Sequence, residues 1–116
     1  MKKINLTITG CMGRMGQQLI KTSKKDKRVK LYSLTESKII KKTVGGIRPQ
    51  LNNKEAFKKT DVIIDFTVPK CTFEVLRIAS ILKKRVVIGT TGFTKKEEDL
   101  IKIYSKKIQN LQKEKK

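Results

Sequence analysis

Three glycines near the start of the chain have the spacing of a phosphate-binding loop. Gly10, Gly13 and Gly16 follow an alternating apolar segment at residues 4–8, and they precede a segment with apolar residues on one helical face. A diphosphate needs backbone N–H groups close to its oxygens, and glycine leaves room for that approach. We expect Gly10 to form the turn, Gly13 to admit the phosphates and Gly16 to let the helix pack closely. The spacing is one residue longer than the common G-x-G-x-x-G, so an incidental glycine-rich turn is the alternative interpretation.

An acidic residue follows the second predicted strand, at residues 29–34. Glu36 lies twenty positions beyond Gly16, where a carboxylate can accept hydrogen bonds from the ribose hydroxyls of an adenosine. Its charge favours NADH because it repels a 2′-phosphate, and an exposed acid at a strand end is the alternative. Three lysines follow closely, at positions 38, 41 and 42, so that NADPH also stays open as the cofactor.

The remaining predicted elements alternate between strand and helix. A continuous apolar run at 61–66 is typical of a parallel strand that is covered on both faces. Thr94–Glu97 has the pattern of a capping box that begins a last helix. The other predicted elements are a short helix at 54–59, a helix at 71–84 and a strand at 85–88. This alternation predicts an α/β fold with a parallel sheet, whose ligand-binding loops gather at the carboxyl ends of the strands.

Three segments in this order resemble one enzyme family. They are Gly10–Gly16, Ile64–Pro69 and Val87–Phe93, and together they are similar to 4-hydroxy-tetrahydrodipicolinate reductase, formerly called dihydrodipicolinate reductase. The resemblance implies a Rossmann-like parallel sheet flanked by helices, and hydride transfer from NADH or NADPH in the diaminopimelate route to lysine. Two alternatives stay in view: a non-catalytic nucleotide-binding module, and the first domain of another dehydrogenase with this fold.

The resemblance also implies a set of cofactor-binding residues. The family's pyrophosphate loop corresponds to Gly10, Cys11, Met12, Gly13, Arg14 and Met15, and its acidic ribose ligand corresponds to Glu36. The segments beside the nicotinamide correspond to Phe66, Thr67, Gly89, Thr90 and Thr91. Small residues and backbone groups there would let the nicotinamide lie flat, with one face open for hydride transfer. Ordinary turn chemistry is the alternative for Thr90 and Thr91.

The likeness covers residues 1–108, which we expect to form an NAD(P)-binding domain, followed by a polar, Lys-rich tail at 109–116. The family continues into a substrate domain with a His-His-x-x-Lys motif, and this sequence contains no histidine. We therefore expect a truncated or frame-disrupted product or a fragment, incomplete relative to the family, with no catalytic residue and little turnover alone. The substrate, 4-hydroxy-tetrahydrodipicolinate, and homo-oligomer contacts would belong to the missing domain.

The charge is the strongest competing signal. The 116 residues include 29 basic and 10 acidic side chains, a net charge of +19, which can attract nucleic acid or acidic surfaces. The lysines are scattered and no RNA-binding aromatic motif lies among them, so we favour a compositional bias over specific nucleic-acid binding. Cys11 and Cys71 form neither a metal-site pattern nor a disulfide framework. With no apolar run long enough for a signal peptide or a membrane span, we expect a cytoplasmic protein without a membrane partner.

Overall fold

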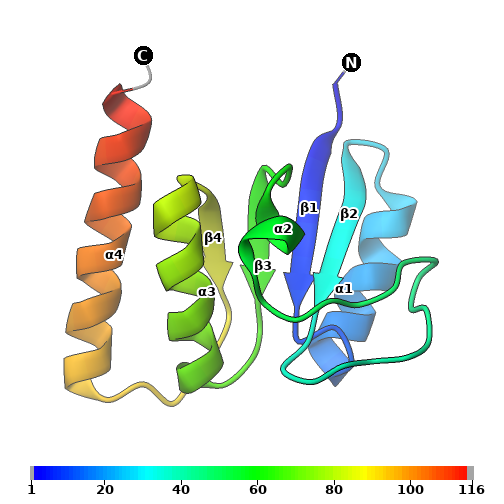
Figure 1. The fold of residues 1–116 in the computed structure, drawn as a ribbon, viewed down its shortest axis with the longest axis horizontal. Helices are drawn as coiled ribbons and strands as arrows, with labels where there is room; N and C mark the ends of the chain where they lie inside the picture. Colours follow the sequence, from blue (N-terminus) through cyan, green and yellow to red (C-terminus); the bar gives the residue numbers. More distant parts are fainter. Residues whose placement is uncertain (1, 115–116) are drawn as a thin grey trace.

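The computed structural model describes residues 2–114, with side chains as far as Ile108, and it confirms the α/β prediction. The elements are β1 (Ile4–Thr9), α1 (Arg14–Lys25), β2 (Val29–Thr35), α2 (Lys54–Phe57), β3 (Val62–Asp65), α3 (Pro69–Leu82), β4 (Arg85–Ile88) and α4 (Lys95–Glu114). The four strands form one parallel sheet in the order β2-β1-β3-β4 (Figure 1). The chain thus has a Rossmann-like sheet flanked by helices.

Apolar side chains cover the sheet on both faces, as the run at 61–66 predicts. Ile63 of β3 packs with Phe57 of α2 and Val75 of α3 on one face. Its neighbours Val62 and Ile64 pack against the second cluster, which contains Ile20 of α1. Successive residues of a strand point to opposite faces, so a continuous apolar strand is what a sheet between two layers of helices requires.

The helix ends follow from local chemistry and differ in part from the sequence-based ranges. α2 ends at Phe57 rather than at 59, and α3 ends at Leu82 rather than at 84, because Lys83 caps it in the left-handed conformation. Pro69 occupies the first turn of α3, so that helix begins before the predicted 71 because proline needs no hydrogen-bond acceptor there. The predicted capping box of α4 is confirmed: the Glu97 carboxylate accepts from the Thr94 N–H at 2.8 Å, and the Thr94 hydroxyl accepts from the Glu97 N–H at 3.2 Å. α4 continues past Ile108 to Glu114, since lysine, glutamine and glutamate are good helix formers.

The sheet has an open edge at β4. In Figure 1 the strands point the same way, and the loops after β1, β3 and β4 lie together at the end to which the arrows point. α4 packs beside α3, and a groove of about 420 Å³ lies between β4, α3 and α4, lined by residues that include Val87, Ile101 and Ile108. Within residues 2–114, no strand pairs with the outer edge of β4. No helix in this part of the chain has the length and apolar character of a membrane span.

Candidate functional site

Two glycines of the loop between β1 and α1 stand where the chain packs too closely for a side chain. Gly10 has φ +62°, and a Cβ atom there would lie 2.8 Å from the Thr67 Cγ2 and 2.9 Å from the Phe66 carbonyl oxygen. A Cβ atom on Gly16 would overlap the Gly10 carbonyl oxygen and lie 2.8 Å from the Cα of Cys11. Gly13 differs, because a Cβ atom there has one neighbour within 4 Å, the Gly10 oxygen at 3.4 Å. The protein itself therefore requires glycine at positions 10 and 16, and it leaves space at position 13.

The first turn of α1 is free of any protein cap. Gly13 is the N-cap residue, no side chain bonds to the helix start, and the first turn contains no acidic residue. The N–H groups of a first helical turn have no partner within the helix, and they carry the positive end of the helix dipole. By contrast, the N–H groups of Cys11 and Gly13 donate to the carbonyl oxygens of Thr35 (3.2 Å) and Gly10 (3.1 Å). An anion can therefore bind at the start of α1, past the turn formed by residues 10–13.

Glu36 joins the end of β2 to the glycine loop. One carboxylate oxygen accepts from the Met12 N–H at 3.0 Å, and the other accepts from the Ser37 N–H at 3.0 Å. The side chain is half-buried. It stands at the position where the second strand ends beside the loop, as expected for a ribose-binding acid in this class of fold.

A cavity of about 290 Å³ brings several of the predicted residues together. It is lined by Gly10, Gly13, Glu36, Ser37, Asn52, Phe66, Thr67, Val68 and Cys71. Five of these belong to the predicted cofactor-binding set, from three separate segments of the chain. Sequence reasoning missed the other four lining residues, Ser37, Asn52, Val68 and Cys71. Asn52 comes from the segment between β2 and α2, and its side-chain oxygen is buried without a hydrogen-bond partner in the described chain.

The other predicted residues of the glycine loop do not line this cavity with their side chains. Cys11 is fully buried in the core with Ile8 and Ile20. Burial first, and then the charge of Glu36, raise the pKa of the Cys11 thiol to about 11, so that it stays protonated at neutral pH. Arg14 and Met15 are exposed in the first turn of α1, and Met12 packs against the core. At these positions the backbone is what the loop offers to a ligand.

The loop after β4 packs against the loop after β3. The Phe66 ring occupies the place where a side chain on Gly89 would lie. Thr90 is buried, and its hydroxyl accepts from the Thr67 N–H at 2.8 Å. Thr91 is exposed. Farther along, the Phe93 ring meets the Phe73 ring of α3 edge to face, with 5.9 Å between their centroids.

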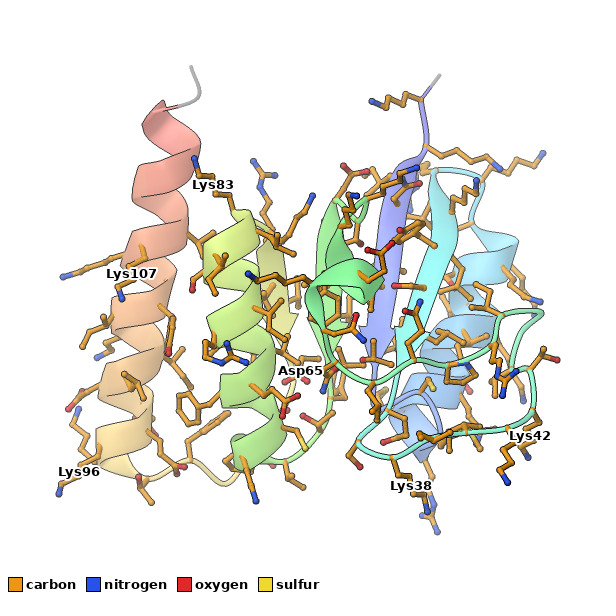
Figure 2. The ribbon with its side chains drawn as sticks, viewed as in Figure 1. Lys38, Lys42, Asp65, Lys83, Lys96 and Lys107 are labelled. Atoms are coloured by element: carbon orange, nitrogen blue, oxygen red, sulfur yellow. The ribbon has the colours of Figure 1, made fainter. Side chains whose placement is uncertain are left out.

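A buried carboxylate lies beneath these loops, at the end of β3. Asp65 is fully buried, and its first oxygen accepts from the hydroxyls of Thr9 at 2.5 Å and Thr67 at 2.9 Å. Its second oxygen accepts from Thr72 and, at 3.1 Å, from Thr90. Figure 2 labels Asp65, which lies at the carboxyl end of the inner strand β3. The described residues include no cluster of three or more His, Cys, Asp or Glu that could hold a metal ion.

The parallel sheet, the glycine turn and the uncapped first turn of α1 define a class, the Rossmann-like nucleotide-binding domains. A family model described as "Dihydrodipicolinate reductase, N-terminus" matches residues 4–114. The chain belongs to this dihydrodipicolinate reductase family, which confirms the resemblance of the three sequence segments.

Curated relatives agree with this assignment. The chain is 67% identical over 108 residues to the 4-hydroxy-tetrahydrodipicolinate reductase of Pelagibacter ubique strain HTCC1062, covering 93% of this chain and 42% of the relative. It is 40% identical to the enzyme of the same name from Buchnera aphidicola subsp. Baizongia pistaciae, again over 93% of this chain and 44% of the relative. The chain therefore spans less than half the length of these relatives.

Solved structures give the same result for the fold. A dipicolinate-bound dihydrodipicolinate reductase from Paenisporosarcina sp. TG-14 superposes with a TM-score of 0.69 at 28% identity, over 89% of this chain and 43% of that one. A D-galactose-1-dehydrogenase from Rhizobium etli superposes with a TM-score of 0.73 at 21% identity, over 93% of this chain and 35% of that one. The second match shows a shared fold only.

Proposed function

We propose that this chain is the NAD(P)H-binding part of a 4-hydroxy-tetrahydrodipicolinate reductase. The observation that carries the proposal is the first turn of α1, which has no protein cap and opens beside the cavity that Glu36 lines. That pairing offers N–H donors for a diphosphate and a carboxylate for ribose hydroxyls. When bound, the reduced nicotinamide supplies a hydride. The hydride would pass to 4-hydroxy-tetrahydrodipicolinate. That substrate would be bound by a region that the longer relatives have and that this sequence does not span.

Different segments of this chain would bind different parts of the cofactor; Glu36, Phe66 and Thr67 line the cavity, and the loop at Gly89–Thr91 packs behind it. The first turn of α1 would hold the diphosphate, and Glu36 would hold the adenosine ribose. Phe66, Thr67 and the loop at Gly89–Thr91 would stand beside the nicotinamide. Their packing supports this role, because the Phe66 ring covers Gly89 and the Thr67 N–H is fixed on Thr90. We place the protein in the cytoplasm, where the two free thiols fit a reducing setting.

We further propose that NADH binds more tightly than NADPH. A 2′-phosphate would stand close to the Glu36 carboxylate, whose two oxygens already face the Met12 and Ser37 N–H groups. Like charges at this range disfavour binding. Lys38 and Lys42 lie at the same end of the molecule as Asp65 and the cavity loops (Figure 2), so their attraction for a phosphate opposes the effect of Glu36.

Titration calorimetry with NADH and NADPH tests both parts of the proposal. For Glu36→Gln, the Kd for NADH is expected to rise about tenfold, since a hydrogen bond to a charged group is lost, whereas the Kd for NADPH stays level or falls. The matched control is Glu98→Gln, which removes the same charge from an exposed position on α4 and should leave both values unchanged. Absence of binding by the unmodified chain would refute the cofactor site, and equal loss for both nucleotides would refute the preference.

A further inference from the structure

Asp65 lies where three strand ends meet. Its donors come from the end of β1 (Thr9), the loop after β3 (Thr67), α3 (Thr72) and the loop after β4 (Thr90). Its backbone carbonyl also accepts from the Gly89 N–H at 2.7 Å. Asp65 thus forms hydrogen bonds with both loops that we propose to contact the nicotinamide, the loop after β3 and the loop after β4.

The four threonine hydroxyls occupy the hydrogen-bond acceptor positions of the Asp65 carboxylate. An ionised carboxylate offers about four acceptor positions, and here each oxygen receives two hydroxyls. A hydroxyl has a single proton to donate, so donation to Asp65 fixes the direction of the oxygen lone pairs. The Thr90 oxygen can then accept from the Thr67 N–H at 2.8 Å. The charge of Asp65 therefore orders the contact between the two loops, although Asp65 does not line the cavity.

The neighbouring backbone transmits this order to the cavity surface. Phe66 stands between Asp65 and Thr67 in the chain, and its ring packs directly on Gly89. Thr9 precedes Gly10, whose φ of +62° allows close contact with Thr67. A shift in the hydroxyl set would move the Phe66 ring and the Gly89 backbone together, whereas Glu36 is fixed separately by Met12 and Ser37.

We propose that Asp65, with Thr9, Thr72 and Thr90, is a positioning residue for the nicotinamide half of the cofactor. The proposal rests on the proposed NAD(P)H-binding function. It separates the pocket into two parts: an adenosine part that depends on Glu36, and a nicotinamide part that depends on a buried carboxylate and its hydroxyls.

The test compares NADH with ADP-ribose, which lacks the nicotinamide, using the full chain. For Asp65→Asn, the Kd for NADH is expected to rise about tenfold, while the Kd for ADP-ribose changes less than about twofold. Thr72→Val should act in the same direction with a smaller effect, because it removes one donor and keeps the side-chain shape. If Asp65→Asn does not fold, Thr72→Val provides the test alone. The fluorescence emission of bound NADH should shift toward that of free NADH in both variants.

Thr60→Val is the matched control. Thr60 is as buried as Thr72, and its hydroxyl bonds to the carbonyl oxygens of Asn5 and Val62 at 3.1 Å, away from the cavity. It should lower the melting temperature as Thr72→Val does, yet leave both Kd values unchanged. Equal weakening of NADH and ADP-ribose by Asp65→Asn and Thr72→Val would overturn the positioning role, as would no change in either. If the unmodified chain binds neither compound, the proposed function itself fails.

Discussion

The three glycines of the β1–α1 loop have different physical reasons for being glycine. At Gly16 a side chain would collide with the backbone of the loop, and at Gly10 the positive φ and the contact with Thr67 exclude one. At Gly13 the protein leaves space, although this residue lines the cavity. Under the proposed function, space for the diphosphate rather than packing within the protein would account for the glycine at position 13.

We predict that Gly13→Val and Gly16→Ala separate binding from stability. Gly13→Val should abolish measurable NADH binding and lower the melting temperature little, because its side chain enters space that the diphosphate needs. Gly16→Ala should cost about 1–3 kcal/mol of unfolding free energy, as overpacking in a tight site does. Calorimetric titration and thermal unfolding of both variants measure these effects. A strongly destabilised Gly13→Val protein would contradict this assignment.

At the scale of elements, the strands were the most predictable part of the chain. The continuous apolar run at 61–66 predicted β3, and the strand predicted at 85–88 has the bounds of β4. The glycine loop and Glu36 could be found because their spacing depends on local geometry. The Thr94–Glu97 capping box is likewise a local pattern, and the structure confirms it.

The parts that were missed depend on contacts between distant segments. Asn52 reaches the cavity through the segment between β2 and α2, where Gln50 bonds with Leu34 and Glu36. That segment has no periodic pattern to read, and Gly45 and Gly46 turn it with positive φ angles. Asp65 looked like an acid that bounds a strand, because nothing in the linear sequence shows four threonine hydroxyls converging on it.

We predict that the β4 edge makes the chain self-associate as its concentration rises. An unpaired edge strand presents free backbone groups to other chains, and here Val87 is 54% exposed beside the apolar groove. Val87→Lys should shift the chain toward the monomer in light scattering coupled to size-exclusion chromatography. Ile39→Lys, at a 72% exposed residue outside the strands, is the control and should change nothing. A monodisperse monomer for the unmodified chain at high concentration would argue against association through this edge.

At the scale of the whole molecule, the net charge of +19 is spread over several surfaces. Figure 2 places Lys83 at the opposite end of the molecule from Lys38 and Lys96, and Lys107 on the outer helix α4. Charge distributed in this way attracts polyanions without reading their sequence, whereas a specific nucleic-acid site needs contacts to base edges. This arrangement fits the interpretation of the lysines as a compositional bias.

We predict weak polyanion binding that salt removes. Binding to fluorescently labelled single-stranded DNA should weaken steeply between about 50 and 200 mM salt, since lysines release condensed counterions from phosphates. Homopolymers and mixed sequences should bind alike in anisotropy titrations. A sequence preference that persists at the higher salt concentration would instead indicate a dedicated nucleic-acid site.

The two N–H groups that hold Glu36 have a consequence for the energetics of nucleotide capture. Because Met12 and Ser37 fix both carboxylate oxygens before any nucleotide arrives, the rotamer freedom of that side chain is already lost on folding. Ordering a side chain of this kind at an interface costs about 0.5–1.5 kcal/mol, and the bound state no longer bears that cost. Under the proposed function, an incoming ribose would meet a preorganised acceptor, and its hydroxyls would share the carboxylate oxygens with the Met12 and Ser37 amides.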